Sequence, residues 1–170
     1  AGSTVQSPRV GDNLIVMPKY PSMPWEWDAA VPDVVLASLD PVDVEGYEEV
    51  NSPAYEGVYV SGQAQGVLVL VKRAGTAPSL YMPMVTDPLM THVTGAVQRG
   101  RALLGPGGAR GDMTLSLPVL TGVGEPGVID PGKLVHVADP EGAWRGLVRS
   151  VRVTVAPPAV DQVITLERHL

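Results

Sequence analysis

The fold is decided by the stretch Gly142-Ala-Trp-Arg-Gly-Leu-Val-Arg-Ser-Val-Arg-Val-Thr-Val155, followed by Pro157-Pro158 and by Val160-Asp-Gln-Val-Ile-Thr-Leu-Glu-Arg-His-Leu170. One face of its last part is apolar and the other is polar: the first carries Ile164, Leu166 and Leu170, the second Asp161, Thr165, Glu167 and His169. Alternation with a period of two is typical of a half-buried β-strand. The stretch therefore predicts a hairpin and a final strand that seals an edge of a small closed barrel.

Further strands are predicted on the N-terminal side of this stretch, at residues 13–16, 55–61, 67–71, 113–119 and 133–138. The apolar run at 67–71 is uninterrupted, which indicates a strand buried on both faces. Arg149 is out of phase with the alternating valines that follow it, and the nearby Gly146 favours a β-bulge there. The 17 prolines and 19 glycines favour strands and turns over long helices.

One helix is predicted at about 88–104. Asp87 suits the N-cap, Pro88 suits the first helical position, and Gly105 suits the position after the end. Gly100 lies in the apolar stripe of this helix, where we expect the helix backbone to approach a sheet closely. The fold class is therefore predicted as mainly β, an antiparallel barrel with one inserted α-helix.

The chain is predicted to divide near residue 54. Residues 1–54 contain seven prolines and are expected to form an irregular, acidic arm, whereas residues 55–170 form the β domain, with its small barrel at about 112–170. Trp25 and Trp27 suit an anchor for this arm, either on the body of the same chain or on a neighbouring subunit. The sequence leaves these two readings open.

The charge is unevenly placed. Residues 20–71 contain no Lys, Arg or His but nine acids, whereas the rest of the chain carries 12 bases and nine acids; −9 and +3 give the net charge of −6. An acidic segment repels nucleic acid rather than binding it. A solvated surface and a surface that faces a basic partner or passing DNA are both compatible with this segment.

No catalytic pattern is present in the sequence. There is no cysteine, and His92, His136 and His169 lack the spacing of a zinc site. No Gly-x-Ser-x-Gly elbow or phosphate-binding loop occurs, and no apolar run approaches the ~20 residues that span a bilayer. The sequence therefore predicts no enzyme, no metal or cofactor and no membrane insertion.

Several short motifs follow one another in a recognisable order. They are Gln65-Gly-Val-Leu-Val-Leu-Val-Lys-Arg-Ala-Gly-Thr76, Asp87-Pro-Leu-Met-Thr91, Ala96-Val-Gln-Arg-Gly-Arg101, Asp130-Pro-Gly-Lys-Leu-Val-His-Val137, Trp144-Arg-Gly-Leu-Val148 and Gln162-Val-Ile-Thr-Leu-Glu-Arg168. In this order and spacing, the chain from about residue 55 resembles the tail-tip or baseplate hub proteins of tailed bacteriophages, of the siphophage type. The first third of the chain departs from that pattern.

The resemblance implies a structural protein of the virion tail tip, made in the host cytoplasm. It implies a homotrimeric ring that joins the tail tube to the tip, contacts other tail-tip, distal-tail and tail-tube proteins, and surrounds the conduit for DNA ejection. DNA is then a passing cargo that the protein does not bind. Candidate residues for the subunit interface are Trp25, Trp27, Val67, Val69, Val71, Arg149 and Arg152. Candidates for lining the conduit are Asp40, Asp43, Glu45, Glu48 and Glu49.

A second function class remains open. A monomeric β-barrel module that binds oligosaccharide or peptide would use aromatic side chains of the first half of the chain, exposed around a groove. The candidates for such a groove are Trp25, Trp27, Tyr47 and Tyr55.

Overall fold

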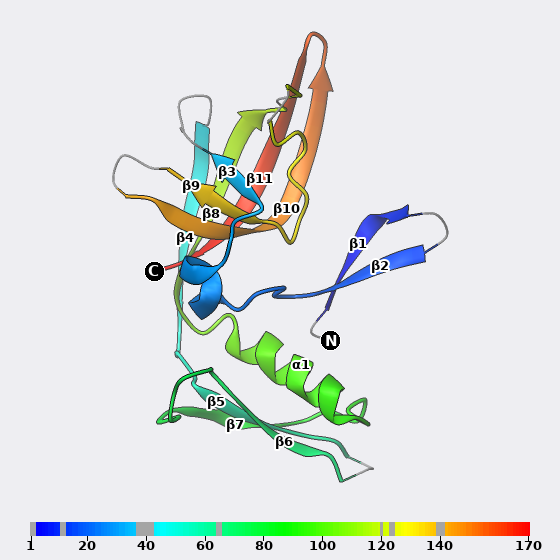
Figure 1. Ribbon diagram of the computed structural model, residues 1–170, viewed down its shortest axis with the longest axis vertical. Helices are drawn as coiled ribbons and strands as arrows, with labels where there is room; N and C mark the ends of the chain where they lie inside the picture. The colour runs from blue at the N-terminus through cyan, green and yellow to red at the C-terminus, as the bar shows by residue number, and fades with distance from the viewer. Residues whose placement is uncertain are drawn as a thin grey trace. The chain divides into compact units, whose positions relative to one another are not determined.

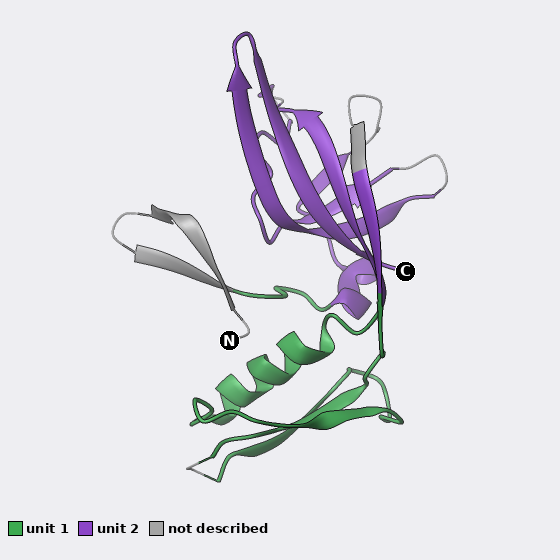
Figure 2. Ribbon diagram, turned by 180° about the vertical axis from the view of Figure 1, so that it is seen from behind, with its two compact units in different colours: residues 1–23, 51–108 green, residues 24–50, 109–170 purple. Residues whose placement is uncertain are grey.

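The computed structural model describes residues 3–10, 13–36, 43–63, 66–119, 121–122, 125–138 and 142–170. The chain divides into two compact units: residues 1–23 with 51–108, and residues 24–50 with 109–170 (Figure 2). Each unit combines segments from both sides of residue 54. Residues 1–54, expected to be irregular, contain in their described part β1 (Ser3–Val10), β2 (Asn13–Pro18), η1 (Pro24–Ala29), β3 (Val34–Leu36) and β4 (Asp43–Ser52).

The second unit is built on a six-stranded sheet with the strand order β3-β9-β10-β11-β8-β4 (Figure 1). Its remaining strands are β8 (Gly108–Pro118), β9 (Leu134–Val137), β10 (Trp144–Ala156) and β11 (Ala159–His169). The pairs β9–β10, β10–β11 and β11–β8 are antiparallel, whereas β3 runs parallel to β9. The parallel pair is possible because a long stretch of chain separates β3 from β9.

The mainly β fold with one helix is confirmed, but the closed barrel is not formed. Within the described part of the chain, β3 and β4 end the sheet and do not pair with each other. The prediction that the last strand seals an edge is also wrong, because β11 lies inside the sheet and pairs with β10 on one side and β8 on the other. The sheets are mixed rather than purely antiparallel, since β5 and β7 also pair in parallel.

The period of two in the last strand is confirmed on its core side. The side chains of Ile164 and Leu166 are fully buried. They pack with apolar side chains from other strands of the sheet and from the loop before β9, among them Leu36, Leu115, Leu117, Ile129, Val135, Val137, Trp144 and Val148. Each such side chain contributes about 1.5 to 3 kcal/mol when it is removed from water. The expected bulge is also present: the register of β10 and β11 shifts between Val148 and Ser150, which leaves Arg149 without a cross-strand partner.

The first unit packs one helix on a three-stranded sheet. The strand order is β6-β5-β7, and the elements are β5 (Gly57–Ser61), β6 (Leu68–Lys72), β7 (Tyr81–Thr86) and α1 (Val93–Leu104). The helix lies along β5 and β6, as Figure 1 shows. On this side of the sheet Val58 and Val60 are fully buried and Val71 is 7 % exposed. A Cβ atom at Gly100 would lie 2.5 Å from Cγ2 of Val71, which confirms the expected close approach of helix and sheet.

The predicted start of the helix is wrong by five residues, whereas its predicted end at residue 104 is correct. His92, not Asp87, is the N-cap, and its Nδ1 accepts a hydrogen bond from the backbone N–H of Thr94 at 3.3 Å. Asp87 instead begins a turn in which its Oδ1 accepts from the N–H of Leu89 at 3.0 Å. Asp followed by Pro suits the first two positions of such a turn as well as it suits a helix start.

The contact of Gly100 with Val71 can be tested by substitution in urea denaturation. We expect Gly100→Ala to destabilise the protein by about 1 to 3 kcal/mol, because the added methyl group overpacks the helix–sheet contact. Gly95→Ala is the matched control, since its Cβ would meet only Sδ of Met90, at 3.7 Å. That change should be neutral or stabilising by up to ~1 kcal/mol. Equal stability of the two variants would contradict the close approach.

Candidate functional site

The histidines and acids of the described chain do not converge on one site. Among the described residues no group of three or more His, Cys, Asp or Glu side chains is placed to hold a metal ion. His92 caps the helix, and His169 bonds to Glu167. The described part of the chain also has no helix that is long and apolar enough to cross a membrane. The features that stand out are surfaces rather than a reactive centre.

Two of the interface candidates, Trp27 and Arg149, are used within the second unit. Arg149 donates from Nε to Oε2 of Glu167 at 2.7 Å and from Nη2 to the same oxygen. The other carboxylate oxygen, Oε1, lies 2.9 Å from Nε2 of His169. The ring of His169 meets the ring of Trp27 edge-on at 5.2 Å. Trp27 is only 2 % exposed, so its side chain is buried within this chain.

The same cluster corrects the expectation for the polar face of β11. Glu167 was expected on an open face, but it is 4 % exposed because η1 covers this end of the sheet. Arg145 fastens η1 further by donating from Nη1 to the carbonyl oxygen of Trp27 at 2.7 Å and to that of Asp28. Trp25 is half-buried. Trp25 and Trp27 are two residues apart, but their side chains do not point to the same side, because they lie in a 3₁₀ helix rather than a strand.

The apolar run at 67–71 is covered on one face only. Val71 faces the helix, and Val67 and Val69 are half-buried. The alternate residues Leu68 and Leu70 are 61 % and 39 % exposed, which contradicts the expected burial of this strand on both faces. Opposite Leu70 in the ladder lies Tyr59, whose ring stacks on that of Tyr81 at 6.0 Å. Both tyrosines are about two-fifths exposed, at 40 % and 43 %. We call Tyr59, Leu68, Leu70 and Tyr81 the outer face.

Arg152 lies on the far part of the β10–β11 hairpin, which extends beyond the core (Figure 1). Its side chain is exposed, and it makes no ion pair with any residue that the structure describes. The apolar side chains nearby are also exposed, with Val153 at 42 %, Val155 at 66 % and Val160 at 38 %. Of the two interface arginines, Arg152 is therefore the one whose charge faces solvent.

The conduit candidates fall on and before β4. Asp40 lies outside the described residues, and for Asp43 and Glu45 the structure describes only the backbone of the strand. Glu48 and Glu49 are both exposed. As consecutive residues of a strand they point to opposite faces of the sheet. The acids therefore do not form one single-faced stripe.

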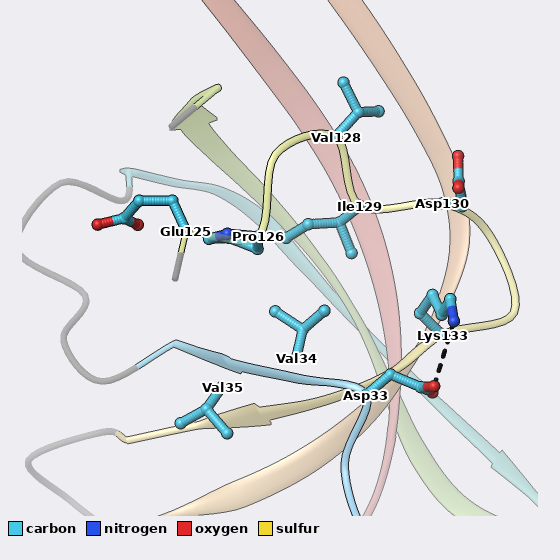
Figure 3. A pocket seen from close by; sticks show the side chains of 9 residues that line it. All are labelled: Asp33, Val34, Val35, Glu125, Pro126, Val128, Ile129, Asp130 and Lys133. Atoms are coloured by element: carbon cyan, nitrogen blue, oxygen red, sulfur yellow. Dashed lines mark hydrogen bonds and ion pairs between the residues drawn. The ribbon is translucent and has the colours of Figure 1, made fainter. Parts of the chain in front are cut away.

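A cavity of about 540 Å³ was not predicted from the sequence (Figure 3). It lies between β3 and the loop before β9, and its lining is mixed: Asp33, Val34, Val35, Glu125, Pro126, Val128, Ile129, Asp130 and Lys133. Lys133 pairs with Asp33 at 3.2 Å. The loop is held by the buried Gln162, which accepts from the N–H of Ile129 at 3.0 Å and donates to the carbonyl of Gly127 at 2.8 Å. Among the described residues of the lining there is no Ser, Thr, Tyr, Cys or His side chain.

Glu56 has a perturbed pKa in the first unit. The backbone N–H of Ser79 donates to its Oε2 at 2.5 Å, and the Ser79 hydroxyl donates to the same oxygen at 2.9 Å. These two bonds favour the carboxylate and lower the pKa of Glu56 below its ordinary value. Their contribution to stability is present at neutral pH and is lost as the pH falls through the lowered pKa. The contact fixes the loop before β7.

The buried pair of Arg149 and Glu167 can be compared with an exposed pair by urea denaturation. We expect Arg149→Met to cost about 3 kcal/mol, because it leaves a buried carboxylate without its main partner. Lys133→Met removes the exposed pair with Asp33 and should cost at most ~1 kcal/mol. If the two substitutions cost the same, the cluster does not have the structural role assigned to it.

Comparison with known proteins gives a fold likeness and no family assignment. No family model matches the sequence, and no curated protein matches it. The structure is similar to the 43 kDa tail protein of prophage MuSo2 from Shewanella oneidensis, with a TM-score of 0.52 and 16 % identity over 98 % of this chain. It is also similar to the tail protein from Neisseria meningitidis MC58, with a TM-score of 0.45 and 17 % identity over 82 % of this chain.

The coverage of those two proteins is partial. The chain spans 51 % of the Shewanella protein and 45 % of the Neisseria protein, so it corresponds to about half the length of each. At these identities the likeness concerns the fold, and only the first comparison has a TM-score above 0.5. The chain thus has the fold of about half of a phage tail protein.

Proposed function

We propose that this protein is a non-enzymatic structural component of a phage tail tip or baseplate hub. In this proposal it forms part of a ring, with three copies of the chain, that joins the tail tube to the tip. The single observation that supports it most is the fold likeness to a prophage tail protein over 98 % of the chain. Since the chain corresponds to about half of that protein, other tail-tip, distal-tail and tail-tube proteins are expected to complete the assembly.

The outer face of the first unit supports an assembly role. Tyr59, Leu68, Leu70 and Tyr81 all lie 39 % to 61 % exposed, next to one another on three paired strands. Large contiguous apolar patches are rare on the surface of isolated monomers, and where they occur they often mark interaction sites. A neighbouring subunit would remove these side chains from water, as the sequence led us to expect for the run at 67–71.

The acids of β4 support a position near passing DNA. Glu48 and Glu49 are exposed, and the chain from residue 20 to 71 carries no base that would neutralise them. Repulsion between carboxylates and phosphates would keep DNA from adhering during ejection. In the proposed ring at least one face of β4 therefore borders the central opening.

A module that binds oligosaccharide or peptide is the second candidate. Trp27 is buried and unsuited to such a groove, but the stacked pair of Tyr59 and Tyr81 offers an exposed aromatic platform. Saturable binding of peptidoglycan fragments by a monomer, with loss of binding in Tyr59→Ala, would favour this candidate over the assembly role.

Light scattering coupled to gel filtration tests the assembly role. We expect the wild-type chain to be oligomeric at micromolar concentration and the double change Leu68→Ser and Leu70→Ser to weaken self-association at least about tenfold, because covering each leucine is worth ~1.5 to 3 kcal/mol. Leu89→Ser is the matched control, since Leu89 is 79 % exposed outside the outer face, and it should not alter the mass. A monomeric wild-type chain at these concentrations would contradict the proposal.

Electron microscopy of the assembled particle tests the conduit. A three-dimensional reconstruction is expected to show a central opening bordered by β4, because the acids there are the ones proposed to face DNA. A ring with β4 on its outer rim would refute the conduit role while leaving the assembly role standing.

A further inference from the structure

The strand β10 has an open edge along its outer half. On the side away from β11 it pairs with β9 only from Trp144 to Leu147. The backbone of Val148 then bonds to Gly132 and Lys133. Beyond that residue, the described chain places no strand against β10, although β10 continues to Ala156. About half of this strand is therefore paired on one side only (Figure 1).

The alternation of hydrogen-bonded and non-hydrogen-bonded pairs in the hairpin shows which residues of β10 direct their backbone N–H and C=O groups to the open edge. The hairpin closes with Ala156 opposite Ala159, and in antiparallel pairs the residues that bond to each other alternate with those that do not. Val160 directs its carbonyl away from β10, to the N–H of Val119 on the β8 side. Its partner Val155 therefore directs its own backbone groups outward, and so do Val153 and Val151, which lie at steps of two.

This edge lacks the features that normally prevent pairing. Exposed edges are protected by charged side chains, prolines, bulges or short length. From Ser150 to Ala156 the open edge has no proline, its register with β11 is regular, and Arg152 is its single charged residue. The exposed Val153 and Val155 continue the apolar row that starts at the core with Val151. Such an edge is suited to accept a further strand.

The strand β4, which ends the sheet on the side beyond β11 and β8, carries negative charge, whereas β10 carries positive charge. β4 is the last strand after β8 in the sheet, so one of its sides is also open within the described chain. Between residues 43 and 52 it has four acids and no base: Asp43, Glu45, Glu48 and Glu49. β10 has three bases and no acid, namely Arg145, Arg149 and Arg152.

We propose that the open edge of β10 pairs with the open edge of β4 in a second copy of this chain, so that the large sheets of neighbouring copies join. Arg152 is then the residue that meets the β4 carboxylates, because Arg149 is already paired with Glu167. Pairing of β10 with itself is less favourable, since it would bring Arg152 of both copies together without an acid. A contact between two different edges is head-to-tail and can close a ring. This inference rests on the proposed assembly role and specifies the contact between neighbouring copies.

Each edge can be blocked separately. Val153→Pro removes an N–H that points to the open edge and leaves the bonds of the hairpin to β11 in place. The double change Glu48→Lys and Glu49→Lys cancels the net negative charge of β4 and places two bases beside its remaining acids. Glu125→Lys is its control on an exposed loop position. We expect both edge variants to be monomeric by light scattering and Glu125→Lys to assemble like the wild type. Arg152→Glu is the second β10 variant, to be used if circular dichroism shows that Val153→Pro does not fold.

A mixing experiment decides between the two pairings. Val153→Pro keeps an intact β4 edge, and the Glu48→Lys, Glu49→Lys chain keeps an intact β10 edge. Mixed in equal amounts, they should form a species of two chains, one of each kind, that neither forms alone. Assembly that is blocked by Val153→Pro but unaffected by the β4 changes would overturn the proposal in favour of β10 pairing with itself.

The remaining outcomes separate this inference from the assembly role. Wild-type-like rings from folded Val153→Pro would overturn the edge pairing and leave the assembly role intact, with the outer face as its contact. A wild-type chain that stays monomeric at about 100 µM, a hundredfold above a micromolar Kd, would overturn both.

Discussion

The larger unit depends on the placement of the last strand between two others. Because β11 pairs with β10 on one side and β8 on the other, its side chains reach both faces of the sheet centre. On one face Ile164 and Leu166 fill the core, and on the other Glu167 and His169 receive η1. A strand in this position holds together the two segments of the unit, residues 24–50 and 109–170.

The parts of the fold that local chemistry dictates were predictable from sequence. The alternation around Ile164, the bulge at Arg149 and the close approach at Gly100 each follow from the residues at one place in the chain. The end of the helix at Leu104 is of the same kind. These features depend on side-chain period, backbone freedom and capping, which a single sequence displays directly.

The parts that depend on distant segments were not predictable. Glu167 looked like a solvent-facing residue because nothing near it in sequence shows that η1 covers it. Leu68 and Leu70 looked buried because a continuous apolar run does not reveal which neighbours exist. The cavity beside β3 needs Gln162 to hold a loop more than thirty residues away in sequence. The start of the helix failed for a local reason, since Asp87-Pro88 serves a turn and a helix start equally well.

The bulge in β10 gives Arg149 an electrostatic role without changing how the hydrophobic side chains of the strand pack. Without a residue opposite it, Arg149 stands outside the alternation, and Val148 and Val151 both face the core because of that extra position. A chain lacking this one residue would keep all other side chains on their present faces, in an unbroken ladder. It would, however, bury the carboxylate of Glu167 without its guanidinium. The extra residue in β10 is thus explained by the ion pair that Arg149 makes with Glu167, and the packing of the hydrophobic side chains does not require it.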